Sequence, residues 1–242
     1  MRICLVTEHY PPHVGGLETV FFEYAKNLAK RDHQVRVVTS NSGGITGYKN
    51  DNGVSVYYLP TTNFLSHPIL NSALLTPHIQ WADVVHTTTL SAGPIALRIC
   101  QREHKPCVLM VHEVLGKRWF SIVPAWPKAA LYYLAEQLVI RRKYSRWHAI
   151  SNYTYLNLIR CGIPAEKIVT IYHGIDDTIW HKDVPPAEIH TFFGIDAQDQ
   201  VFLYSGRPAR IKGIFILLDA IRKIDHALPS SYKFGFIFAT ES

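Results

Sequence analysis

The sequence predicts an α/β protein built on a parallel sheet, because short apolar runs alternate with stretches of helical periodicity. The first run, Ile3 to Val6, is continuous and apolar, as expected of a strand that is covered on both faces. After a turn, Phe21, Tyr24 and Leu28 recur at the spacing of one helix face. This alternation is typical of a parallel sheet with flanking helices, as in Rossmann-type domains.

The alternation continues to residue 171. Pro94 falls in the first turn of a later helical stretch, where proline is tolerated. Residues 64–81 give a mixed pattern, which we interpret as helical with interruptions at Pro68 and Pro77. We expect further strands at 35–39, 54–59, 83–86, 107–111, 147–150 and 167–171, and helices at 92–102, 129–144 and 151–161.

The composition changes after residue 173. A second cycle then begins, with expected strands at 200–205 and 234–238 on either side of one helix. Two strands and one helix cannot cover both faces of a parallel sheet, so we expect this second Rossmann-like domain to be incomplete. The predicted organisation is a Rossmann-like domain at 1–173, a linker at 174–196 and the start of a second domain at 197–242.

The segment from Glu8 to Glu18 joins the first strand to the first helix and contains Gly15 and Gly16. A glycine turn at a helix N-terminus presents backbone N–H groups, with the positive end of the helix dipole behind them, and suits a phosphate. The same glycines are also explained by a tight turn that needs their φ angles. The residues alone leave both interpretations open.

Polar side chains follow two later strands. His86 ends the strand expected at 83–86, and His112 and Glu113 follow the strand expected at 107–111. Ligands of open parallel sheets bind outside the carboxyl ends of the strands, so we expect these three residues on the same side as the glycine turn. For His112 the alternative is a histidine that is fully hydrogen-bonded at a strand end.

Charge and cysteine content restrict the function classes. The chain has 25 Lys and Arg against 19 Asp and Glu, a formal +6 that favours anionic partners such as a nucleotide diphosphate or acidic lipid. The cations are scattered and no zinc-type spacing or aromatic RNA-binding motif occurs, so nucleic acid fits poorly. The four cysteines lack metal-type spacing and are expected as buried thiols in a reducing compartment. No apolar run reaches the ~18 residues that span a bilayer, and no cleavable signal is evident, so we expect a cytoplasmic protein.

Residues 116–147 combine tryptophans, prolines and cations. Trp119 and Trp126 precede Arg141, Arg142 and Lys143, and an interfacial membrane contact uses this combination. The alternative is a helix whose carboxyl end is occupied by cations, which the helix dipole favours by roughly 0.3–1 kcal/mol each. A peripheral contact with the cytoplasmic membrane surface is therefore an expectation for this segment.

Three ordered motifs resemble family 4 glycosyltransferases of the GT-B fold. Tyr10 to Glu18 resembles the family's amino-terminal proline and glycine-glycine loop. Ile150-Ser151 and the stretch from Ile171 to Asp176 resemble its "vS" and "ipNGvD" motifs, with His173 where the family usually has asparagine. Tyr204 to Gly213 resembles "vGRl…KG". The resemblance spans residues 1–242 and implies a GT-B-like fold.

The resemblance implies a retaining transferase that moves a hexosyl group from a nucleotide-diphosphate sugar to a lipid or glycan acceptor, with no metal or other cofactor. It implies that Arg207 and Lys212 clamp the donor diphosphate, because two cations stabilise the charge that grows on the leaving phosphate. It also implies that Gly15 and Gly16 approach the same diphosphate and that His112 is catalytic as a hydrogen-bond partner near the donor sugar.

On the acceptor side the candidates are Glu18 and Glu113. The family's Glu-x7-Glu element is absent, since no glutamate lies between Glu188 and Glu241, so we expect the chain alone to be a truncated, inactive transferase. The alternative is a non-catalytic acceptor-side subunit or scaffold that needs a partner chain to supply the donor half. A dinucleotide oxidoreductase is excluded, because the first turn lacks G-x-G-x-x-G and no acidic residue follows the strand at 35–39.

Overall fold

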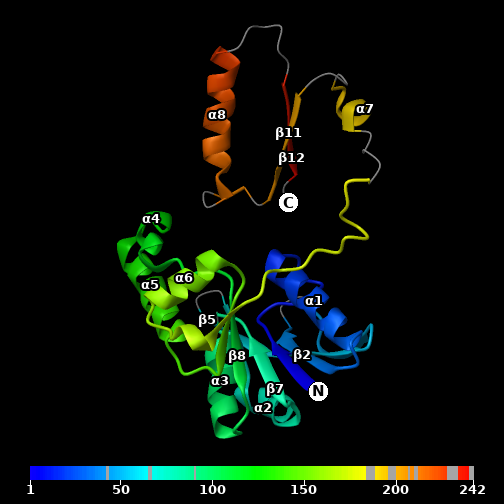
Figure 1. Cartoon of the computed structure of the whole chain (residues 1–242), viewed down its shortest axis with the longest axis vertical. Coiled ribbons are helices and arrows are strands. Elements are labelled where there is room, and N and C mark those ends of the chain that lie inside the picture. The colour runs from blue at the N-terminus through cyan, green and yellow to red at the C-terminus, as the bar shows by residue number, and fades with distance from the viewer. Residues whose placement is uncertain are drawn as a thin grey trace. The chain divides into compact units, whose positions relative to one another are not determined.

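The computed structural model describes residues 1–41, 44–64, 67–89, 91–183, 189–195, 200–206, 208–209, 212–227 and 234–239. The chain divides into two compact units, residues 1–174 and 175–242, and each is described by itself. Figure 1 shows the first unit as a sheet flanked by helices and the second as a helix beside a pair of strands. None of the described helices is both long enough and apolar enough to cross a membrane.

Eight strands of the described part of the first unit form one sheet, in the order β10-β9-β8-β7-β1-β2-β4-β3. Neighbouring strands pair in parallel except β3 and β4, which are antiparallel. The strands are β1 (Arg2–Val6), β2 (Gln34–Ser40), β3 (Gly47–Asp51), β4 (Val54–Leu59), β7 (Val84–Thr87), β8 (Cys107–Val111), β9 (Arg146–Ala149) and β10 (Ile168–Thr170).

Helices follow most of these strands. A separate antiparallel pair, β5 (Thr61–Phe64) and β6 (His67–Leu70), precedes the second helix. The α-helices of this unit are α1 (Gly16–Ala29), α2 (Ser72–Trp81), α3 (Ala92–Arg102), α4 (Trp119–Ile122), α5 (Trp126–Ile140) and α6 (Asn152–Arg160). Two short 3-10 turns are η1 (Gly116–Arg118) and η2 (Ala165–Lys167).

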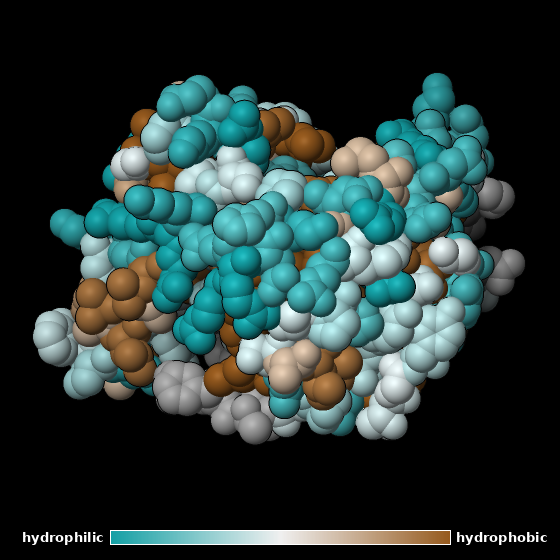
Figure 2. Space-filling view, turned by 90° about the horizontal axis from the view of Figure 1, so that it is seen from below, coloured by the Kyte–Doolittle hydropathy of each residue, from teal (hydrophilic) through white to brown (hydrophobic). Residues whose placement is uncertain are grey.

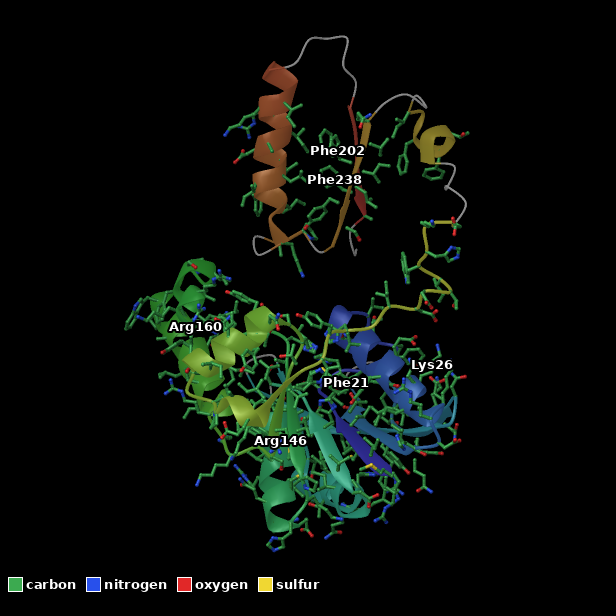
Figure 3. The ribbon with its side chains drawn as sticks, in the orientation of Figure 1. Phe21, Lys26, Arg146, Arg160, Phe202 and Phe238 are labelled. Carbon is green, nitrogen blue, oxygen red and sulfur yellow. The ribbon has the colours of Figure 1, made fainter. Side chains whose placement is uncertain are left out.

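Both faces of the sheet are covered, as the continuous apolar runs predict. Alternate residues of a strand point to opposite faces, so Cys4 and Val6 pack in the cluster that includes α2 and α3, whereas Leu5 packs with α1. Phe21 of α1 is fully buried against that second face, as Figure 3 shows between the helix and the sheet. Burying one such side chain stabilises the fold by roughly 1.5–3 kcal/mol.

The strand order fixes where a ligand can reach the sheet. From β1 the chain moves outward to β2 and β4, then returns to β7 on the other side of β1. The boundary between β1 and β7 is therefore a switch point, and loops that leave their carboxyl ends diverge to open a crevice. Glu8 follows β1 and Thr88 follows β7, so both lie at this switch point.

The second unit contains α7 (Ile189–Phe193), β11 (Gln200–Ser205), α8 (Ile214–Ala227) and β12 (Phe234–Ala239). β11 and β12 pair in parallel, and Phe202 stacks on Phe236 with ring centroids 5.3 Å apart. A parallel pair joined through a helix is the start of a Rossmann-type sheet.

Three local expectations were wrong. Residues 61–64 and 67–70 pair as β5 and β6, and the helix of that region starts later, where the Asn71 side chain accepts hydrogen bonds from the N–H groups of Ala73 and Leu74. The helix expected at 129–144 begins at Trp126, because Pro127 suits its first turn, and it ends at Ile140. The glycine-rich stretch at 41–53, which suggests a loop between the strands at 35–39 and 54–59, contains the antiparallel strand β3.

Candidate functional site at the carboxyl edge of the sheet

The amino terminus of α1 lies at the switch point, and no side chain caps it. Helices leave their first N–H groups without intrahelical partners, and side chains usually satisfy them. Two other helices that begin at this edge of the sheet follow this rule: the Glu8 carboxylate accepts a hydrogen bond from the N–H of Ala92 at 2.6 Å to cap α3, and Ser151 Oγ accepts one from the N–H of Thr154 at 3.1 Å to cap α6. The N-cap residue of α1 is Gly15, which has no side chain to do so. The site thus offers backbone donors to an outside acceptor.

The two glycines of this loop have different surroundings. A Cβ at Gly15 would overlap Glu18 Oε2 and lie 2.9 Å from Glu18 Cδ, whereas a Cβ at Gly16 would meet nothing within 4 Å. Glu18 is buried, and its Oε1 lies 2.9 Å from Nδ1 of His13, whose ring stacks on His9. Gly15 therefore makes room for Glu18, and no packing within the unit requires a glycine at position 16.

Glu8 joins the two strands of the switch point. Its carboxylate accepts from the Thr88 hydroxyl at 2.5 Å and the Ser91 hydroxyl at 3.3 Å, in addition to the N–H that begins α3. The side chain is fully buried, and a buried carboxylate is tolerated where several donors and a helix dipole surround it. Glu8 therefore fixes the loop after β7 relative to β1.

Four histidines gather at the carboxyl ends of β7 to β10. His148 Nε2 lies 2.9 Å from the carbonyl of Ile171, and its Nδ1 lies 3.4 Å from His86 Nε2. The rings of His112 and His173 are 5.2 Å apart. Burial lowers the pKa of His86 to about 3 and that of His112 to about 4, and it also lowers the pKa values of His148 and His173. The four side chains are thus neutral imidazoles near pH 7.

His112 has an unused hydrogen-bonding atom. Its Nε2 is buried and has no partner within the described part of the chain. Its carbonyl accepts from the Thr154 hydroxyl at 3.1 Å, which fixes the end of β8 against α6. A buried nitrogen without a partner costs about 1–3 kcal/mol, and this atom is able to bond to a ligand group that enters the site. Glu113, the next residue, is exposed.

Glu136 connects α5 to the same loop. Its two carboxylate oxygens accept from the N–H groups of Leu115 and Gly116 at 2.8 and 2.7 Å. These amides belong to the segment that follows His112 and Glu113, so the position of α5 and the conformation of that segment are linked. Sequence reasoning missed both Glu8 and Glu136, because each acts on residues that are distant along the chain.

The predicted cations of the diphosphate clamp belong to the second unit. Lys212 is exposed and lies two residues before the start of α8, in the strand-loop-helix arrangement of β11 and α8. Gly213 has a φ of 76°, which favours glycine. Arg207 lies outside the described residues. Gly15, Gly16 and His112 thus share one edge of the first unit, while Lys212 is at the corresponding strand end of the second.

The cysteines are unpaired thiols, with Cys4, Cys100 and Cys107 buried and Cys161 partly buried. A hydrogen bond with Cys100 and burial raise the pKa of Cys107, and burial also raises that of Cys4. Such thiols are poor nucleophiles and metal ligands. Among the described residues, no group of three or more His, Cys, Asp or Glu side chains is placed to hold a metal ion.

The fold is that of GT-B glycosyltransferases. Sucrose-phosphate synthase from Thermosynechococcus elongatus matches with a TM-score of 0.75 at 17% identity, over 100% of this chain and 62% of that one. HepE from Anabaena, in complex with UDP-glucose, matches with a TM-score of 0.68 at 17% identity, over 98% and 60%. WaaG, a glycosyltransferase involved in lipopolysaccharide biosynthesis, matches with a TM-score of 0.65 at 17% identity, over 98% and 62%.

A sequence profile of Glycosyltransferase Family 4 matches residues 14–179, and the chain belongs to this family. One of the subunits of human phosphatidylinositol N-acetylglucosaminyltransferase is 27% identical over 121 residues, which cover 43% of this chain and 25% of the human protein. The chain spans about a quarter of that relative and about 60% of the solved structures. The predicted family and the GT-B-like fold class are confirmed.

Proposed function

We propose that this family 4 glycosyltransferase chain takes a hexosyl group from a nucleotide-diphosphate sugar and transfers it to a lipid acceptor with retention of configuration, without a metal. A glycan acceptor is the second choice. The HepE structure contains UDP-glucose, which supports a nucleotide sugar as donor. The name of the human relative includes phosphatidylinositol, which supports the lipid acceptor.

One observation supports the donor site most strongly. Helices α3 and α6, which begin at the same edge of the sheet, are capped by Glu8 and Ser151, whereas α1 begins at Gly15 and Gly16 without a side-chain cap on its backbone donors. A helix N-terminus with a small-residue loop binds phosphate through these donors and the helix dipole. In the proposed complex the donor diphosphate lies against this loop, and the contribution of Arg207 and Lys212 to its binding stays a prediction from the family resemblance.

The chemistry follows from where charge develops. As the bond between sugar and phosphate breaks, negative charge grows on the leaving diphosphate, and fixed donors and cations there stabilise the transition state more than the ground state. His112 Nε2 is a buried atom at the same edge that has no partner among the described residues. Because burial lowers the pKa of His112 to about 4, this side chain acts as a neutral hydrogen-bond partner of a sugar hydroxyl and does not add a third cation to Arg207 and Lys212.

The experiment is a transfer assay with radiolabelled UDP- and GDP-sugars, phosphatidylinositol-containing lipid extracts and the His112→Ala variant. Because the chain has no Glu-x7-Glu element, we expect it to bind the nucleotide sugar and to form at most traces of labelled lipid. Any such product should keep the anomeric configuration of the donor, and its formation should fall at least roughly 100-fold in the variant, the scale of removing one transition-state hydrogen bond. An inverted product contradicts retention. No transfer and no nucleotide binding overturn the proposal.

A second candidate is the non-catalytic acceptor-side subunit. The second unit exposes several apolar side chains of β11 and α8, including Leu203 and Ile216, which a partner chain could cover. The human relative is itself named as a subunit. This candidate is favoured if the chain binds nucleotide without transferring sugar and forms a defined complex in size exclusion when the partner is supplied. It is rejected if the monomer transfers sugar.

A further inference from the structure

One region of the first unit holds the entire charge excess of the chain. Residues 113–160 contain eight Lys and Arg side chains and two carboxylates, an excess of six that equals the formal net charge of all 242 residues. The remaining residues are balanced. Apart from Arg146, these cations belong to η1, α5, α6 or the turn that follows α5. Individual cations are scattered along the whole sequence, but the excess of positive over negative charge is therefore concentrated on neighbouring helices.

The outer face of α5 is apolar and exposed. Leu131, Leu134 and Leu138 recur at helical spacing and are 46, 56 and 66% exposed, and Trp126 at the start of the helix is 70% exposed. The single carboxylate of α5, Glu136, is occupied by the N–H groups of the loop after β8. The leucine stripe thus has no negative charge of its own, and cations lie at both ends of the helix.

α6 extends this face. Tyr153, Leu156 and Ile159 share one side of α6 and are exposed. The Gln137 side chain of α5 donates to Cys161 Sγ at 3.9 Å, which places the end of α6, marked by Arg160 in Figure 3, beside α5. Figure 2 shows hydrophobic side chains gathered among hydrophilic ones at the left, the side on which Figure 1 draws α4 and α5.

We propose that the outer face of α5 and α6 docks on an anionic membrane surface. An apolar helix face with tryptophan and flanking cations is the composition of a helix that lies in the bilayer interface. A second copy of the chain is a poor occupant, because a symmetric interface would bring the same positive patches together. Protein interfaces are also depleted in lysine, whereas anionic lipids supply the missing counter-charge.

Docking there would bring lipid close to the candidate site. Glu136 holds the segment after His112 and Glu113 to the inner side of α5, so a lipid surface against the outer side lies one helix away from these residues. The inference deepens the proposed lipid acceptor, but its test measures vesicle binding and not sugar transfer. A failure of the membrane-docking proposal is therefore distinguishable from a failure of the proposed transfer function.

The test is co-sedimentation of the full 242-residue chain with vesicles of phosphatidylcholine alone or mixed with phosphatidylglycerol. We expect binding to the mixed vesicles that weakens as salt is raised. The triple variant Arg141→Gln, Arg142→Gln, Lys143→Gln should lose roughly 100-fold in affinity, since each cation near an anionic surface contributes about a factor of five to ten. Leu134→Ser with Leu138→Ser should also weaken binding.

The matched control is Lys30→Gln, Arg31→Gln, Arg98→Gln, which removes the same charge from exposed positions on α3 and at the end of α1. It should retain most of the binding. Equal binding to both vesicle types, equal loss in the control, or no binding to either vesicle overturns the proposal. A lipid-free dimer that the Leu134→Ser, Leu138→Ser variant dissociates would instead assign the face to a protein interface.

Discussion

The Gly16→Ala variant tests whether the glycine at this position is needed for folding or for binding a ligand. Gly16 is the first residue of α1, and a Cβ there meets nothing within 4 Å. Alanine in place of glycine reduces the entropy of the unfolded chain and favours the helix, so Gly16→Ala should raise the free energy of unfolding by about 0.5–1 kcal/mol. The added methyl group stands where we place the donor diphosphate, so UDP affinity should fall at least roughly tenfold, or about 1.4 kcal/mol.

Gly15→Ala is the matched comparison. Its Cβ would overlap the Glu18 carboxylate and displace it from His13, which should lower the free energy of unfolding by about 1 kcal/mol. Urea unfolding and calorimetric titration with UDP measure both quantities for each variant. If Gly16→Ala is stabilised and binds UDP like the parent, the diphosphate does not lie at this loop. If Gly16→Ala is destabilised, our account of its backbone is wrong.

Three further predictions concern the supporting contacts. Glu8→Ala should lower the free energy of unfolding by about 3 kcal/mol, because a buried hydroxyl and the first N–H of α3 lose their acceptor; a loss below about 1 kcal/mol in urea unfolding would contradict this. Glu136→Ala should accelerate hydrogen exchange of the amides at 115 and 116 by roughly tenfold or more, and unchanged exchange would show that α5 does not hold this loop. Burial lowers the pKa of His86 to about 3 in the folded state, below its unfolded value, so the free energy of unfolding should fall as the pH drops from about 6.5 toward 3, by about 2 kcal/mol at pH 5. Urea unfolding should show a flatter pH profile for His86→Asn. The profile should not change for His104→Asn, which replaces an exposed histidine and serves as the control.

Local patterns predicted most of the sheet. Continuous apolar runs located β4, β8 and β11 at their observed bounds, and Ser151 caps α6 as its position before that helix indicates. The carboxyl-end rule placed His86 and His112 at one edge, because the direction of parallel strands fixes where each strand ends.

The missed features depend on contacts that local patterns do not contain. Glu8 acts on residues 80–84 positions away, so its role as the cap of α3 follows from the pairing of β1 with β7 and not from its neighbours in sequence. The antiparallel β5–β6 pair overlaps a stretch with apolar spacing that also fits a helix. The predicted start of α5 is too late because a proline among aromatics and cations has the composition of a loop, although proline is favoured in a first helical turn.

Calorimetric titration of the chain with UDP, GDP and their sugar conjugates, beside the Arg207→Ala, Lys212→Ala variant, is the direct test of nucleoside diphosphate binding. We expect the parent to bind a nucleoside diphosphate and the variant to lose this binding, because the variant lacks the two cations that are predicted to pair with the phosphates. Binding that is unchanged in the variant, or absent from the parent for every nucleotide, would contradict the proposed donor site.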